Sequence, residues 1–297
     1  MKKLFIGIGV LAVVIVIAAL SGTSDKQPVD SKNTADLNNR ITLQDAHGLA
    51  VDRQDSSKLY IATHTGILML SKDTELQRVG TARDDYMGFS THPTDANTFF
   101  SSGHLNSGGN IGFQKTTDGG KSWQKISDGA GGPVDFHAMT VSQADPNIVY
   151  GVFMGQLQRS YDAGKTWGTV NTKIGNIITL STNTASADTV YAGTTNGLYV
   201  SQNRGNEWNK INGINGAITA VAVNPNDSQN IMVYSDNQGL IRSIDGLNTW
   251  TALKGYSGNT AMHLTSDTQN PSILYLINQA LEIHKTANDG ETWTKIR

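Results

Sequence analysis

The sequence predicts an all-β protein, a six-bladed β-propeller, and three observations support that prediction. All five tryptophans occupy the same place in a repeated pattern, Ser/Thr-x-Asp/Asn-x-Gly-x-x-Trp, at spacings of 44, 41, 42 and 43 residues. The chain holds 31 glycines and few charged or aromatic residues, as expected for short strands joined by many turns. Each repeat also has room for four short strands, and four antiparallel strands in about 42 residues are typical of a propeller blade.

We call the repeated pattern the repeat turn. Its Asp or Asn can bond backbone two residues on and close a tight turn, and its Gly tolerates a positive φ. Its Trp is large and apolar, so we expect it to be largely buried between neighbouring sheets. One copy has Leu247 for Gly, and a decayed sixth copy begins at Ser71 and has Arg78 for Trp. The five recognisable copies hold Asp118 and Trp123, Asp162 and Trp167, Asn203 and Trp208, Asp245 and Trp250, and Asn288 and Trp293.

A second recurrence lies upstream of each repeat turn. In every unit an aromatic residue or Met follows a small or polar residue by ten positions, which predicts a first hairpin of constant length. Ile41–Leu43 is expected to add a strand that helps to close the ring, since open sheet edges are a liability. The pairs are Ala50 and Tyr60, Ser90 and Phe100, Thr140 and Tyr150, Ser181 and Tyr191, Ala222 and Met232, and Thr265 and Tyr275. The predicted blades span roughly 45–80, 85–127, 135–171, 176–212, 216–254 and 260–297.

The N-terminus reads as an export segment. Two lysines precede an uninterrupted apolar run, Leu4–Leu20, so residues 1–21 are either an uncleaved membrane anchor, which we favour, or a signal peptide cleaved near Ser21. Residues 22–44 are polar and predict a linker, followed by the propeller at 45–297. Either alternative places the propeller outside the cytoplasm of a bacterium, in contact with the membrane through residues 4–20 if the segment is retained.

Composition excludes several function classes. The chain has no cysteine, which excludes disulfides, a thiol nucleophile, a cysteine-linked lipid and any Cys-ligated metal. Its formal charge of −2, without a basic patch, argues against nucleic acid as a partner.

The repeat turns resemble the Asp-box, or bacterial neuraminidase repeat, over about residues 45 to 297. Families with this repeat include sialidase-like, sortilin-like and photosystem-assembly-factor-like propellers, so the resemblance implies the fold more than the function. Sialidases use three arginines, a Tyr–Glu pair and an aspartate. Three of the four glutamates here lie in or beside repeat turns, and we expect these turns on the face opposite the ligand-binding loops. The sequence therefore argues against a sialidase site. Other glycoside hydrolysis needs two carboxylates, so a glycosyl-hydrolase-like activity stays open.

Blades 1 to 3 share polar residues that blades 4 to 6 lack. In each of these blades an Asp stands fifteen residues before the aromatic residue of the hairpin pair, and His or Met stands two residues after that Asp. A second His or Met stands four residues after the aromatic residue. If Asp52 pairs with Leu59, His47 faces His64, and the equivalent pairs in blades 2 and 3 face each other. The predicted ligand-binding set is Asp45, His47, His64, Asp85, Met87, His104, Asp135, His137 and Met154.

These residues are expected at the channel mouth of blades 1 to 3, bordered by the Gly-rich loops 106–110 and 128–133. Neutral imidazole and carboxylate suit a divalent transition metal, with His47, His64, His104 and His137 as ligands, and Met87 or Met154 would favour copper. The alternative is that these side chains only make turns or fill the channel. The predicted function is an extracytoplasmic binding module or scaffold for a protein, peptide or glycan. The alternatives are a glycoside-hydrolase-like enzyme and a metal-binding protein.

Overall fold

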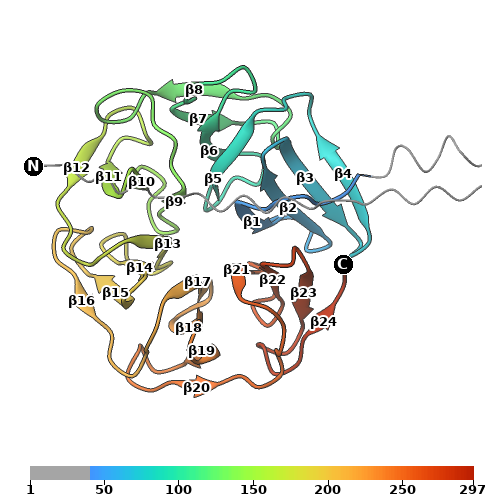
Figure 1. Ribbon diagram of the computed structural model, residues 1–297, viewed down its shortest axis with the longest axis vertical. Coiled ribbons are helices and arrows are strands. Elements are labelled where there is room, and N and C mark those ends of the chain that lie inside the picture. The colour runs from blue at the N-terminus through green and yellow to red at the C-terminus, as the bar shows by residue number, and fades with distance from the viewer. Residues whose placement is uncertain (1–40) are drawn as a thin grey trace, which may run out of the picture. The chain divides into compact units, whose positions relative to one another are not determined.

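The computed structural model describes residues 41–297, which form six four-stranded antiparallel sheets set as blades around a centre (Figure 1). No helix occurs among these residues, so none there can span a membrane. The compact unit begins at Ile41. The apolar run Leu4–Leu20, the choice between anchor and signal peptide, and residues 22–40 of the predicted linker lie outside the described residues.

The chain builds one blade at a time. Blade 1 comprises β1 (Gly48–Val51), β2 (Lys58–Thr63), β3 (Gly66–Ser71) and β4 (Glu75–Val79). Blade 2 comprises β5 (Asp85–Thr91), β6 (Phe99–His104), β7 (Phe113–Thr116) and β8 (Gln124–Ser127). Blade 3 comprises β9 (Ala138–Val141), β10 (Val149–Phe153), β11 (Gln156–Ser160) and β12 (Gly168–Val170).

Blades 4 to 6 follow the same order. Blade 4 comprises β13 (Ile177–Thr182), β14 (Val190–Thr194), β15 (Gly197–Ser201) and β16 (Asn209–Lys210). Blade 5 comprises β17 (Ile218–Asn224), β18 (Asp227–Ser235), β19 (Gly239–Ser243) and β20 (Thr251–Ala252). Blade 6 comprises β21 (Ala261–Ser266), β22 (Leu274–Asn278), β23 (Ile283–Thr286) and β24 (Thr294–Lys295). The six blades and their boundaries match those predicted from the repeat.

The first strand of each blade lies innermost and the fourth lies at the rim (Figure 1). Each inner strand contacts the inner strands of both neighbouring blades, and β1 contacts β21, so the ring is closed. Consecutive strands pair in order within every blade. Each blade is therefore built from one continuous segment of the chain, and no blade combines strands from both ends of the propeller.

The register of the inner hairpins is the same in all six blades. The small or polar residue and the aromatic residue or Met ten positions later lie directly opposite each other in every blade, as in Ala50 with Tyr60. The assumed pairing of Asp52 with Leu59 is wrong by one residue, because Val51 pairs with Leu59. The Asp52 N–H donates to the Lys58 carbonyl at 2.9 Å, and its carboxylate accepts hydrogen bonds from the Gln54 N–H at 2.8 Å and the Tyr60 hydroxyl at 3.0 Å.

The repeat turns are held by their Ser/Thr and Asp/Asn side chains. In blade 3, Asp162 Oδ1 accepts a bond from the Thr166 N–H at 2.8 Å, and its Oδ2 accepts one from the Thr166 hydroxyl at 2.7 Å. Ser160 Oγ accepts a bond from the Gly164 N–H at 2.8 Å. Gly164 has a φ of 84°, a conformation that favours glycine. The short polar side chains thus satisfy backbone donors that the turn would otherwise leave free.

Each Trp packs between its own blade and the preceding one. The Trp167 ring lies 5.2 Å from the Phe113 ring of blade 2 and 4.9 Å from the Phe136 ring beside blade 3, centroid to centroid. All five tryptophans are half-buried, so the prediction that they are largely buried holds only in part.

The junction between blades 6 and 1 lacks a Trp, because the decayed first copy has Arg78 at that place. An apolar cluster replaces it, in which Leu59, Ile61 and other blade 1 residues meet Tyr275 and Ile277, with Ile41 and Leu43 packed against them. Residues 41–43 form no strand, which corrects the prediction.

Side-chain bonds complete this junction. The Arg297 guanidinium donates to the Ile41 and Thr74 carbonyls, each at 3.2 Å, so the carbonyl of Ile41 is held by a side chain rather than by a ladder. Lys285 Nζ lies 2.8 Å from the Asp73 carboxylate in the decayed first turn.

Candidate ligand and metal site at the channel mouth

The two faces of the ring carry different connections. Each inner strand starts at one face, which we call the entry face, together with the second-to-third strand loops and the links between blades. The repeat turns join third to fourth strands and therefore lie on the opposite face, which we call the turn face. The Gly-rich loops 106–110 and 128–133 lie on the entry face, as predicted, and meet where Asn110 Nδ2 donates to the Pro133 carbonyl at 2.9 Å.

The centre of the ring is hollow at both faces. A cavity of about 360 Å³ opens on the entry face and one of about 180 Å³ opens on the turn face. One apolar residue from each inner strand lines both cavities and forms a waist between them: Leu49, Phe89, Met139, Leu180, Val221 and Leu264. Polar ligands can therefore enter from either end but meet an apolar constriction midway.

The mouth of the entry-face cavity is built by irregularities in the inner strands. Blades 2, 4, 5 and 6 each contain a β-bulge that leaves one residue of the inner strand unpaired: Met87, Ile178, Thr219 and Met262. These four residues line the cavity together with His47 and His137, which occupy the equivalent place in blades 1 and 3. A bulge re-aims a side chain. In these four blades the unpaired residue lines the mouth.

The bulge also corrects the predicted pairing in blade 2. Met87 does not face His104, because His104 pairs with Asp85 and Met87 is the unpaired residue. In blade 3, His137 does not face Met154. The His137 N–H donates to the Val152 carbonyl, while Met154 lies in the turn between β10 and β11 with a φ of 51° and an exposure of 89%. Met154 thus points to solvent rather than to the histidine.

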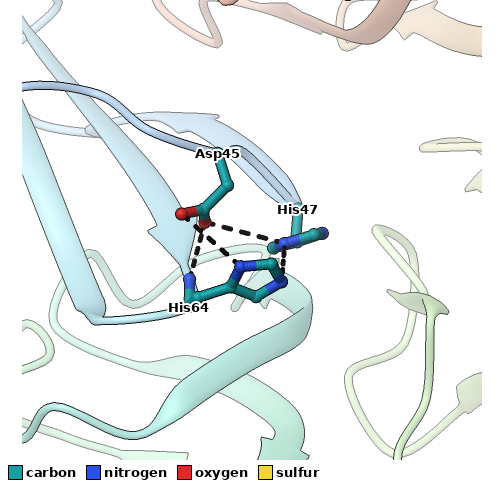
Figure 2. Close-up of side chains that lie close together, drawn as sticks. All are labelled: Asp45, His47 and His64. Carbon is teal, nitrogen blue, oxygen red and sulfur yellow. Dashed lines mark hydrogen bonds and ion pairs between the residues drawn. The ribbon is translucent and has the colours of Figure 1, made fainter. Parts of the chain in front are cut away.

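Three blade 1 residues nevertheless converge. Figure 2 shows Asp45, His47 and His64 with their polar ends turned toward one another. The two histidine Nε2 atoms are 2.7 Å apart. Asp45 Oδ1 accepts a hydrogen bond from the His64 N–H at 2.6 Å and lies 3.6 Å from His47 Nε2, and its Oδ2 lies 3.6 Å from His64 Nδ1.

The cluster continues into blades 2 and 3 as an arc of alternating imidazoles and carboxylates. Asp85 Oδ2 lies 3.8 Å from His64 Nε2 and 3.6 Å from His104 Nδ1. Asp135 Oδ2 lies 3.4 Å from His104 Nε2 and 2.8 Å from His137 Nε2. We call these seven residues the His–Asp arc. It joins the four histidines and three aspartates singled out in the sequence, while Met154 lies apart.

The carboxylates of the arc are poorly compensated. Asp135 is buried, and one oxygen each of Asp85 and Asp135 is buried without a hydrogen-bond partner. Among the described residues, histidines are the only basic side chains in ion-pair contact with Asp45, Asp85 or Asp135. Burial, and next the adjacent His64, lower the pKa of His47 and favour its neutral form. A carboxylate with a buried and unpartnered oxygen favours a nearby cation.

One histidine that lines the entry-face cavity, His263, was not predicted from the repeat. His263 lies one residue out of phase in the sequence, because the place equivalent to His47 is occupied by Met262, while His263 pairs with Ile277. Since a carbonyl only accepts, His263 Nε2 donates its proton to the Ala46 carbonyl at 3.0 Å and ties blade 6 to blade 1. Burial lowers the pKa of His263 to about 4, so this ring stays neutral and structural at ordinary pH.

The turn-face cavity was also missed by sequence reasoning. Arg53 lies at its edge with its guanidinium 3.4 Å from the Gln143 side-chain oxygen, and burial lowers the pKa of Arg53. Its other polar lining is mostly Ser and Thr hydroxyls, which are too common in strands to stand out in the sequence. No sequence signal separated these residues from ordinary strand residues.

The fold and site define a class, a six-bladed propeller that resembles Asp-box proteins. Residues 155–255, 101 of the 297, match the family described as "Sortilin, neurotensin receptor 3". No curated protein matches the sequence at a significant level.

Solved structures share the fold at low identity. The GH74 xyloglucanase from Xanthomonas campestris is 16% identical with a TM-score of 0.59, over 84% of this chain and 45% of that one. YCF48 bound to D1 peptide is 15% identical with a TM-score of 0.50, over 71% of this chain and 67% of that one. A chain of the nidogen/laminin complex is 11% identical with a TM-score of 0.62, over 80% and 92%. The chain spans about half, or less, of the GH74 structures that it matches.

Proposed function

We propose that this protein is an extracytoplasmic binding module, held at the membrane by residues 4–20, that captures a segment of another protein at the entry face of blades 1 to 3. The observation that carries the proposal is the coincidence, on one face, of a cavity of about 360 Å³, the His–Asp arc and exposed apolar side chains. Concave sites with apolar lining and a few converging polar groups are typical ligand sites.

The exposed apolar residues favour a protein or peptide as the ligand. Leu105 is 43% exposed beside the loop 106–110, Met154 is 89% exposed on the next blade, and Ile178 is 37% exposed at the mouth. Unbranched, polarizable Met side chains adapt to varied partners and are frequent at such surfaces. Two structural neighbours, YCF48 with D1 peptide and the nidogen/laminin complex, are themselves propellers bound to a peptide or protein, which supports this class of ligand.

Site-specific photocrosslinking tests the proposal. A photoreactive amino acid is placed at Leu105 or Met154 in the full chain and activated in intact cells. The control position is Ile244, which is 62% exposed but lies in a repeat turn on the opposite face. We expect one discrete crosslinked partner from Leu105 and Met154 and none from Ile244. Equal crosslinking from all three positions would show that the entry face has no special role.

Glycoside hydrolysis is the second candidate, favoured by the three carboxylates at the mouth and by the likeness to GH74 structures. Two carboxylates on either side of a glycosidic bond suffice for that reaction. A screen of polysaccharides, including xyloglucan, would be run with the wild-type protein and with Asp45→Asn, Asp85→Asn and Asp135→Asn. Sugar release by the wild type that one of these variants abolishes would favour the enzyme. Release that persists in all three would exclude this site as its source.

A further inference from the structure

We propose that Asp45, His47 and His64, with Asp85 as a fourth ligand, bind one divalent transition-metal ion such as Zn²⁺ at the blade 1 side of the mouth. The inference goes beyond partner capture and does not depend on it, because the ligands come from this chain alone. Two imidazoles and two carboxylates form a ligand set that suits Zn²⁺ and related first-row ions, and the chain offers no thiolate.

The two imidazole nitrogens set the position of the ion. His47 Nε2 and His64 Nε2 are 2.7 Å apart, so at most one of them can carry a proton on the side facing the other. At least one Nε2 lone pair is therefore directed into the space between the rings. When both rings carry their proton on Nδ1, both lone pairs converge on that space, which is how a pair of metal-binding histidines is arranged.

Asp45 lies at nearly the separation that coordination requires. With bonds of 2.0–2.2 Å in a tetrahedral site, neighbouring ligand atoms are about 3.3 Å apart. Asp45 Oδ1 is 3.6 Å from His47 Nε2. Asp85 Oδ2 is 3.8 Å from His64 Nε2 but lies outside the group of Asp45, His47 and His64, whose ligand atoms are all within 4.8 Å of one another, so Asp85 has to move inward to bind the same ion. Metal binding needs the Nε2 atoms to separate by about 0.6 Å. The His64 side chain is 51% exposed and free to make that movement.

The scaffold holds these ligands from two directions. Asp45 and His47 lie just before β1, and His64 lies just after β2. Since β1 and β2 are antiparallel, all three residues lie at the open end of one inner hairpin. The bond from the His64 N–H to Asp45 Oδ1 at 2.6 Å fixes the aspartate against the second strand. Asp45 Oδ2 lies 3.6 Å from His64 Nδ1, where a bound ion would favour an N–H on that nitrogen.

The negative charge of the His–Asp arc is an independent reason to expect a bound cation. The arc holds three carboxylates, and within residues 41–297 the only basic groups in ion-pair contact with them are imidazoles, which are neutral in the metal-binding form. Two of these carboxylates, Asp85 and Asp135, each have one buried oxygen without a hydrogen-bond partner. A divalent ion at Asp45 and Asp85 would offset most of the negative charge of the arc, and the cavity would leave the ion accessible to a bound partner.

Metal binding is tested on the full chain purified in detergent, stripped with chelator and titrated with Zn²⁺ by calorimetry. Co²⁺ serves as a second probe, because its visible absorption reports tetrahedral nitrogen and oxygen ligands. We expect one ion per chain for the wild type. His47→Ala and His64→Ala should weaken affinity more than 100-fold, and the milder Asp45→Asn at least tenfold. Thermal unfolding without metal verifies that each variant is folded.

Two histidine variants serve as matched controls. His92→Ala removes a histidine between β5 and β6 on the turn face, and His137→Ala removes the exposed histidine at the far end of the arc. Both should retain wild-type affinity and the Co²⁺ spectrum. Absence of stoichiometric binding to the wild type would overturn the proposal. So would loss of binding in His137→Ala with retention in His47→Ala and His64→Ala. Photocrosslinking at Leu105 is measured separately from metal binding. Failure of the partner-capture proposal can therefore be distinguished from failure of the metal-binding proposal.

Discussion

Gly164 illustrates how one residue of the repeat turn is fixed by space and by backbone conformation together. Its φ is 84°, and a Cβ added there would collide with the Phe113 ring of the neighbouring blade. The turn and the packing between blades thus depend on the same missing side chain. Leu247 at the equivalent place in blade 5 has a φ of 78°, so that copy accepts the strain of a side chain in this conformation.

We expect Gly164→Ala to lower the free energy of unfolding by roughly 2–4 kcal/mol, combining the left-handed backbone with overpacking against Phe113. Gly168→Ala is the matched control, because an added Cβ there meets nothing and the backbone is extended. That control should be neutral or slightly stabilising. Urea unfolding of both variants measures the difference. Equal midpoints would show that the turn tolerates a Cβ and that the contact with Phe113 is unimportant.

Asp162 predicts how the repeat turns respond to acid. Hydrogen bonds from the Thr166 N–H, the Thr166 hydroxyl and the Ser160 hydroxyl lower its pKa to about 2. The folded-state pKa lies below the unfolded value, so its contribution to stability is complete above about pH 4 and disappears as the pH falls through 2. In the Asn203 and Asn288 turns the equivalent backbone N–H donates to an amide oxygen, which does not titrate.

The stability of Asp162→Asn should therefore depend less on pH than that of the wild type between pH 4 and pH 2. Chemical unfolding midpoints across that range measure this dependence. Asp118 and Asp245 have pKa values lowered by their own turns, first by the Ser122 and Thr249 hydroxyls, so a partial change is expected. Identical pH profiles for variant and wild type would mean that the Asp162 hydrogen bonds do not favour the ionised carboxylate.

Among the elements, the half-buried tryptophans differ in one respect that the sequence does not reveal. Trp208 Nε1 donates to the Gly205 carbonyl at 2.9 Å, whereas Trp250 Nε1 is buried without a partner. The equivalent bond is made by Trp167 and Trp293, but Trp123 Nε1 is also buried without a partner although its turn keeps Gly120, so the Leu247 replacement in blade 5 does not alone account for the difference. The same pattern of residues thus gives two different hydrogen-bonding environments.

Trp208→Phe should consequently destabilise the protein by about 1 kcal/mol more than Trp250→Phe, because only the first loses a hydrogen bond while the lost ring volume is equal. Truncation to Ala at either place should remove roughly 2–4 kcal/mol, somewhat less than for a fully enclosed aromatic. Thermal unfolding of the four variants measures both quantities. A larger loss for Trp250→Phe would indicate that its indole N–H is satisfied by bound water.

The hairpins and their bulges show where sequence reasoning succeeded and where it failed. The ten-residue offset identified residues that pair directly in every blade, because a constant hairpin length fixes the register. The offset could not reveal that Asp52 bonds the Lys58 carbonyl rather than facing Leu59, with its carboxylate bonded to the Tyr60 hydroxyl. Nor could it reveal the bulge at Met87, because one unpaired residue changes pairing without changing the spacing of the repeat.

For the whole molecule, the regular tryptophan spacing identified five blades, and the decayed copy at Ser71 with the sixth hairpin pair, Ala50 and Tyr60, identified the other, since each repeat is one sheet of the ring. The same equivalence predicted that His47, His64, His104 and His137 would gather on one face, and the described structure brings them into a single arc with three aspartates. The contacts within the arc depend on bulges and side-chain rotamers, which are set by tertiary packing. The contacts that close the ring between blades 6 and 1 could not be predicted from the repeat, because the two ends of a repeat array are not equivalent to its interior.

That closure leads to a prediction about the stability of the ring. The blade 6 to blade 1 junction has no tryptophan, and Ile41 and Leu43 pack against its apolar cluster from outside the sheets. Replacing both with Ala removes apolar contact worth about 1 kcal/mol for each side chain. Since a closed ring is most vulnerable where it is joined, blades 1 and 6 should open locally before the rest of the molecule does.

Hydrogen exchange of the full chain carrying Ile41→Ala and Leu43→Ala should therefore be accelerated about tenfold or more in β1–β4 and β21–β24. Exchange in β13–β16, on blade 4 away from the junction, should remain at the wild-type rate. Ile244→Ala, a truncation at an exposed residue, is the control and should change neither region. Uniform acceleration across all six blades would show that the ring opens as one cooperative unit. In that case residues 41–43 would contribute to global stability rather than act as a local closure.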